Sequence, residues 1–186
     1  MTWNAFHRRG EILREVAHTA DARLDGVTPM DVAGVSKRFT DEVDVVGALI
    51  LTWHARLGAN IDRALASEPM DRRSAVATAW RTTAEQMPGV RLVIDRATDE
   101  PSTTDLARAM QRARSAERAR LAQAAGLAND AGSSAVVLGG RIEEQARTGL
   151  VAPVAPAAIP AAAPARQERA EARSAFVRRI KAVLAA

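Results

Sequence analysis

Residues 41–67 read DEVDVVGALILTWHARLGANIDRALAS and contain the strongest helical pattern in the chain. Apolar side chains recur there every three or four residues, which places them on one face of an α-helix. That face consists of Val43, Val46, Leu49, Ile50, Trp53, Leu57, Ile61 and Leu65. Thr40 or Asp41 can cap the first turn, and Pro69 stops the helix. This stretch therefore predicts a long helix with one face buried in a core.

Similar periodicity covers most of the chain up to about residue 150. Five further helices are predicted. They cover residues 2–25, residues 71–87 with Asp71 as the cap, residues 88–98 with Pro88 in the first turn, a stretch that Ser102 begins with a near capping box and that runs to about residue 128, and residues 133–148. The glycine- and proline-containing connector between the first helix and residue 41 is predicted to form at most one short turn. The single β-like run, VRLVI after Pro-Gly, is short. We expect an all-α antiparallel bundle of five to six helices, or a helical hairpin completed by a second subunit.

The composition limits the chemistry available to the chain. Its 186 residues include no cysteine, which excludes disulfides, cysteine-ligated metals and thiol nucleophiles. No apolar run approaches the roughly 18 residues of a membrane span, and the N-terminal residues lack the apolar core of a signal peptide. Alanine and arginine are abundant, a bias typical of GC-rich genomes. These features predict a soluble bacterial protein of the cytoplasm.

Charge is distributed unevenly along the chain. Residues 1–150 carry 20 basic and 20 acidic side chains, whereas residues 151–186 carry six basic and two acidic ones. The net charge of +4 therefore comes from the C-terminal end. The predicted organisation is a helical bundle domain at 1–150, an Ala/Pro-rich linker at 151–165 and a basic amphipathic helix at 166–186.

The C-terminal segment has the pattern of a helix that needs a surface. Four prolines in the linker disfavour helix and sheet, and an extended linker of this length reaches roughly 45 Å. The apolar face predicted to bind a partner consists of Phe176, Ile180, Val183 and Leu184. The cations that accompany it are Arg173, Arg178, Arg179 and Lys181. A helix of about 20 residues is marginal alone in water, so we expect this one to dock.

Four kinds of surface could receive this segment. A partner protein or a second copy of the chain is favoured, and the segment's own bundle is an alternative. Nucleic acid is possible because six cations can neutralise phosphates, although no set of base-stacking aromatic residues accompanies them. An acidic membrane surface is less favoured because the segment contains one phenylalanine and no tryptophan. A disordered solubilising tail is the simplest interpretation and is compatible with all four.

The histidines offer only part of a metal site. Glu15 and His18 are three residues apart and share a helix face, a spacing used in di-iron bundles. Such a centre needs a second pair, but Leu51 occupies the equivalent position before His54. The Trp53–His54 dipeptide is similar to one in the metal-dependent DinB-like four-helix enzymes, which take further histidines from a later helix; none follows residue 54 here. His18, His54 and Glu15 are thus weak candidates, and neither a metal nor a cofactor is predicted.

Glu117 lies on an apolar helix face. An inward carboxylate can have a raised pKa and perform acid–base chemistry. More often it is paired, here with Arg114, Arg120 or an arginine of a neighbouring helix. The chain contains no P-loop and no nucleophile elbow. The sequence therefore assigns no catalytic residue.

These observations favour a non-catalytic helical scaffold or adaptor that acts by protein–protein contact, as a homo-oligomer. The alternative is a regulator that binds nucleic acid through its basic tail, and the third hypothesis is a metal- or ligand-binding bundle enzyme. A scaffold needs an exposed apolar groove or a self-complementary face. A nucleic-acid regulator needs a basic patch on the bundle. An enzyme needs His18, His54 and Glu117 to converge on a pocket.

Overall fold

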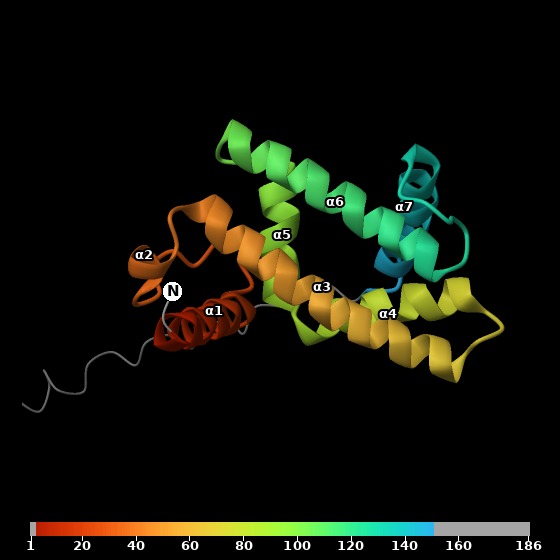
Figure 1. Cartoon of the computed structure of the whole chain (residues 1–186), viewed down its shortest axis with the longest axis horizontal. Helices are drawn as coiled ribbons and strands as arrows, with labels where there is room; N and C mark the ends of the chain where they lie inside the picture. Colours follow the sequence, from red (N-terminus) through yellow and green to blue (C-terminus); the bar gives the residue numbers. More distant parts are fainter. Residues whose placement is uncertain (1–2, 151–186) are drawn as a thin grey trace, which may run out of the picture. The chain divides into compact units, whose positions relative to one another are not determined.

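The computed structural model describes the backbone of residues 3–150 and the side chains of residues 8–150. This part of the chain contains seven helices and no strand (Figure 1). The helices are α1 (Trp3–Arg23), α2 (Val35–Arg38), α3 (Glu42–Ser67), α4 (Arg72–Gln86), α5 (Pro88–Asp99), α6 (Thr104–Ala124) and α7 (Ser133–Arg147). The predicted all-α fold is confirmed for these residues, and none of their helices is long and apolar enough to cross a membrane. The predicted linker at 151–165 and helix at 166–186 lie outside the described residues.

One helix more than the predicted five or six is present because the connector before α3 contains α2. This four-residue helix follows Gly34, whose φ of 91° suits glycine. Val35 and Phe39 are buried and attach the connector to the core. The guanidinium of Arg9 in α1 lies over the Phe39 ring, 4.2 Å from its centroid. The four-residue α2 agrees with the single short turn predicted for this connector, and tertiary packing stabilises it.

The N-terminal caps of α3, α4 and α6 show where a local sequence signal was enough to predict the start of a helix. Asp41 and Asp71 cap α3 and α4 by accepting hydrogen bonds from backbone N–H groups three residues later, as predicted. The prediction that Ser102 begins α6 is wrong, because Thr103 is the cap and Ser102 donates to Glu42 Oε2 at 2.6 Å. Ser102 and Thr103 both carry a hydroxyl that could cap the helix. Because Ser102 contacts Glu42 of α3, Thr103 is the residue that caps α6.

The β-like run VRLVI lies inside α5. This helix begins at Pro88, and its next two backbone N–H groups donate to Asp21 Oδ1 of α1, Gly89 at 2.8 Å and Val90 at 3.2 Å. The two backbones approach so closely that a Cβ at Gly89 would collide with the carbonyl of Ala20. A neighbouring helix therefore supplies the N-terminal cap that α5 itself lacks.

The core is built around α3, which contacts α1, α4, α5 and α6. Figure 1 shows α5 running across α3 rather than alongside it, so the described helices are not all aligned along one axis. Most of the predicted face is buried; Val43, Ile50 and Leu65 are partly buried. Each fully buried large apolar side chain contributes roughly 1.5–3 kcal/mol. This packing places both tryptophans of the core, Trp53 and Trp80, against Glu117 of α6, and Trp80 also meets Arg147 of α7.

Candidate functional site: a buried charge network and an exposed groove

The buried carboxylate of Glu117, on α6, is the centre of a polar cluster inside the helical domain. Trp53 Nε1 donates to Oε2 at 2.9 Å, and Trp80 Nε1 donates to Oε1 at 2.8 Å. His54 Nε2 lies 3.3 Å from Oε2, and Arg91 Nη1 lies 3.6 Å from Oε1. Both carboxylate oxygens are therefore occupied by groups from α3, α4 and α5.

This environment keeps Glu117 ionised. Burial raises its pKa, but the hydrogen bond from His54, the positive charge of Arg91 and the hydrogen bond from Trp80 outweigh burial and lower the pKa to about 2. A carboxylate with so low a pKa is a weak base and carries no proton at neutral pH. The arrangement therefore does not suit general acid–base catalysis.

The cationic partner of Glu117 comes from a neighbouring helix, which was one of the three predicted alternatives. Arg91 of α5 is that partner. Arg114 instead lies 3.9 Å from Glu143 on α7. The helical pattern thus placed Glu117 inward correctly, and helix packing selected its partner.

Arg91 also begins a chain of alternating charges that joins α5, α6 and α7. Arg91 Nη2 lies 2.8 Å from Asp95 Oδ1, and Arg147 Nη2 lies 2.7 Å from the same oxygen. Arg147 Nη2 lies 3.0 Å from Glu143 Oε1, and Arg118 Nε donates to Glu143 Oε2 at 2.8 Å. Each buried charged side chain in this series of ion pairs therefore has an opposite charge within contact distance, as burial requires.

The pKa shifts agree with this pairing. Burial raises the pKa of Asp95, but the hydrogen bond from Arg147 and the charge of Arg91 outweigh it, and the pKa is lowered. Burial lowers the pKa of Arg147, but its hydrogen bond to Asp95 and the charges of Asp95 and Glu143 outweigh it, and the pKa is raised. Asp95 and Arg147 are therefore both charged at neutral pH.

Aromatic rings complete the surroundings of the two arginines. The Trp53 and Trp80 rings meet edge to face, with centroids 5.7 Å apart. Arg91 Cζ lies 4.8 Å from the Trp53 centroid, and Arg147 Cζ lies 4.9 Å from the Trp80 centroid. Among the described side chains, Arg91 Nε is the one buried nitrogen or oxygen atom without a hydrogen-bond partner. The indole faces stabilise this cation through its ring contacts.

A cavity of about 200 Å³ lies beside the network. Its charged lining consists of Arg91, Arg114, Arg147, Asp95, Asp99, Glu117 and Glu143. Apart from Asp99, all of these groups take part in the ion pairs described above. His54 is not part of the lining. The cavity therefore offers little unpaired polarity with which to recognise or transform a substrate.

The structure does not bring the weak metal candidates together as a centre. Glu15 and His18 are exposed on α1, whereas His54 of α3 turns toward Glu117. No group of three or more histidine, aspartate or glutamate side chains that could hold a metal occurs among the described residues. The predicted partner-binding residues of the C-terminal segment lie outside the described residues.

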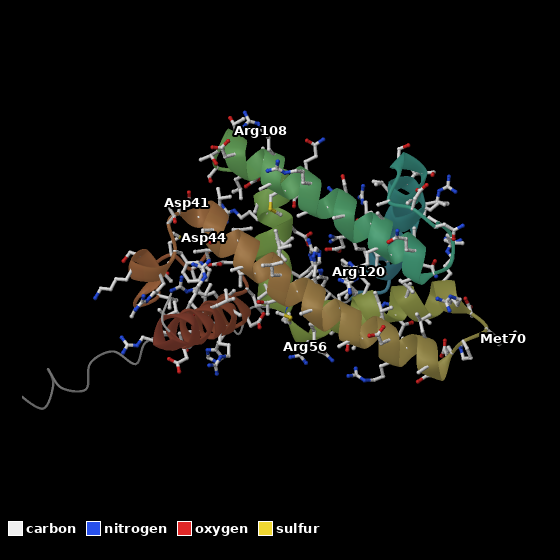
Figure 2. All side chains as sticks on the ribbon, in the orientation of Figure 1. Asp41, Asp44, Arg56, Met70, Arg108 and Arg120 are labelled. Atoms are coloured by element: carbon white, nitrogen blue, oxygen red, sulfur yellow. The ribbon has the colours of Figure 1, made fainter. Side chains whose placement is uncertain are left out.

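An exposed apolar groove lies between α1 and α3. Its volume is about 860 Å³, and its lining consists of Arg9, Gly10, Leu13, Val43, Asp44, Gly47, Ala48, Leu51, Thr52 and Ala55. Leu51 is 71% exposed. Arg9 Nη2 lies 2.6 Å from Asp44 Oδ1, so the two charged lining residues neutralise each other. Figure 2 shows Asp44 at the start of α3 and Arg56, which is not in the lining, on the side of α3 away from α6.

Sequence reasoning missed most of the charge network, although a signal was present. Arg91 lies between Val90 and Ile94 on the buried face of α5, and Glu143 follows Ile142 on the buried face of α7. Each is a charged residue inside an apolar stripe, the same signal that identified Glu117. The groove had a signal too, because Leu51 is a large apolar residue outside the stripe predicted to be buried.

Comparisons of the chain with protein-family models, with curated proteins and with solved structures give no match. A functional proposal must therefore rest on the two features described above, the internally paired network and the exposed groove.

Proposed function

We propose that the chain is a non-catalytic helical scaffold or adaptor that acts by protein–protein contact, and that it forms a homo-oligomer. The observation that carries this proposal is the exposed apolar groove between α1 and α3. Contiguous exposed apolar surface on a soluble protein commonly marks an interaction site. Covering the Leu51 side chain alone would contribute roughly 1.5–3 kcal/mol. The proposed contact is with a second copy of the chain.

The charge network supports the non-catalytic part of the proposal. The enzyme hypothesis required His18, His54 and Glu117 to converge on a pocket. His54 and Glu117 do meet, but the carboxylate is occupied by protein donors, and His18 is exposed on α1. Oppositely charged side chains that satisfy one another across three helices suit a structural role.

Residues 166–186 supply the second contact of the proposed adaptor. This assignment rests on their apolar face, Phe176, Ile180, Val183 and Leu184, and on the cations Arg173, Arg178, Arg179 and Lys181. The bundle itself carries equal numbers of basic and acidic residues, so it adds no net positive charge to these cations. A protein partner for this segment is therefore favoured over nucleic acid.

Sedimentation velocity of the full chain tests the proposal. The wild-type protein should self-associate reversibly, and Leu51→Glu should weaken association at least roughly tenfold because it places a charge in an apolar contact. The matched control is Val137→Glu, because Val137 is also apolar and exposed, at 57%, but lies on α7. A wild-type protein that stays monomeric up to about 1 mM, where an interaction of roughly −4 kcal/mol would be detected, would overturn the proposal.

A further inference from the structure

The outer face of α3 carries a projection and a depression one helical turn apart. Leu51 projects, with 71% of its surface exposed. Gly47, four residues earlier in α3, is the depression: a Cβ built there meets no atom within 4 Å. Gly10 of α1 borders the same groove, and a Cβ built there also meets nothing within 4 Å. The groove therefore contains an exposed apolar side chain, Leu51, and open space at Gly47 that could receive the same side chain from another copy.

An antiparallel two-fold contact uses both features at once. The α3 lining runs from Val43 to Ala55, so Gly47 and Leu51 lie symmetrically about its midpoint. When two such helices pack antiparallel about that midpoint, each Leu51 meets the other copy's Gly47. The two halves of the contact are then identical, as a closed dimer requires. The matched stretch is about 18 Å long, at 1.5 Å per residue.

Charge favours a second copy over the chain's own C-terminal segment as the occupant. Arg9 and Asp44 cancel within the groove, and no other aspartate, glutamate, lysine or arginine lines it. A neutral face suits another neutral face, and an identical copy provides one without placing like charges together. Residues 166–186 carry six cations against two acidic residues, and they would have no unpaired acidic side chain in the groove lining to meet.

We infer that a second copy of this chain covers the α1/α3 groove through antiparallel packing of the two α3 helices, with Leu51 of each copy seated against Gly47 of the other. This inference rests on the proposed function and assigns its self-association to one surface and one register. The small side chains around the projection, Ala48 and Ala55, let the two helices approach closely.

The register is tested by exchanging projection and depression in the full chain. Gly47→Leu fills the depression and Leu51→Ala removes the projection, so each should weaken dimerisation at least roughly tenfold in sedimentation. Gly47→Leu should leave the fold intact because the position is open and helical, and circular dichroism and thermal unfolding check this. The double variant Gly47→Leu/Leu51→Ala moves the projection to the depression and should recover affinity to within roughly threefold of wild type. If the two copies instead met Leu51 against Leu51, the double variant would not recover its dimerisation affinity.

Cross-linking provides an independent readout, because the chain has no cysteine. A Gly47→Cys protein mixed with a Leu51→Cys protein should form mixed disulfide dimers faster than either forms a disulfide with itself. Val137→Cys on α7 is the control and should cross-link slowly with both. Dominant Leu51→Cys self-dimers, or a dimer unaffected by Gly47→Leu, would overturn the register. If Leu51→Glu still dissociates the dimer, the proposed function survives that failure, whereas a monomeric wild type ends both.

Discussion

Glu117→Gln tests whether the buried charge network holds the bundle together. Glutamine keeps the size of the side chain and one acceptor oxygen, but its NH₂ group must face one of the indole donors. Trp53 Nε1 and Trp80 Nε1 now donate to separate oxygens, at 2.9 and 2.8 Å. One of them would lose its acceptor in a buried position, at a cost of about 1–3 kcal/mol. The substitution therefore introduces an unsatisfied donor without creating a cavity.

The lost charge adds to this cost. Arg91 would lose the carboxylate 3.6 Å away and keep Asp95 at 2.8 Å. Removing one partner of a buried ion pair costs about 3–5 kcal/mol, and the remaining partner keeps the cost at the lower end. We expect a total loss of about 4–6 kcal/mol, against a stability of about 5–15 kcal/mol for a domain. The unfolding temperature should fall by roughly 8–24 °C.

Urea unfolding of the full chain, followed by tryptophan fluorescence and far-ultraviolet circular dichroism at one fixed protein concentration, measures this loss. The matched control is Asp105→Asn, which removes an exposed carboxylate of the same helix, 2.9 Å from Arg108. The control should change the free energy of unfolding by less than about 0.5 kcal/mol. A Glu117→Gln protein within that same range of wild type would refute the reasoning, because the carboxylate would then be dispensable.

Three further predictions concern pH, close helix packing and the C-terminal segment. The folded-state pKa of Glu117, about 2, lies below its ordinary value of 4.5, so its contribution to stability is present above about pH 4.5 and is lost as the pH falls toward 2. Wild type should thus lose roughly 3 kcal/mol more than Glu117→Gln between neutral pH and pH 2 in urea titrations, and equal losses would contradict the pKa. Gly139→Ala should lower the free energy of unfolding by several kcal/mol, because its Cβ would collide with the backbone carbonyl of Arg118. At the neighbouring Gly140 a Cβ would make only ordinary contacts, so Gly140→Ala should be neutral or stabilising by up to about 1 kcal/mol. Similar unfolding temperatures for these two neighbours would show that α6 and α7 can separate at little cost. The 1–150 fragment should unfold cooperatively within a few degrees of the full chain, a difference of about 1 kcal/mol or less; loss of the cooperative calorimetric transition would place residues 151–186 in the core.

The sequence by itself determined the helices whose signals are local. The 3.6-residue period of α3, the caps at Asp41 and Asp71 and the first-turn Pro88 involve residues within a few positions of one another. Glu117 could be placed inward for the same reason, because its face is set by its own helix. The sequence allowed one short turn where α2 lies without fixing its position, and the cap of α5 by Asp21 could not be predicted, since the stabilising contacts of both come from distant residues.

Only the tertiary structure decided what each inward or outward residue meets. Helical periodicity specifies the face of Glu117 but not that Trp53, Trp80 and Arg91 arrive there from α3, α4 and α5. It likewise marks Leu51 as outside the main stripe without showing that α1 leaves it uncovered. Hydrogen bonds and ion pairs act over about 3–4 Å, so they depend on how the helices cross, and that arrangement is set by packing the whole core at once.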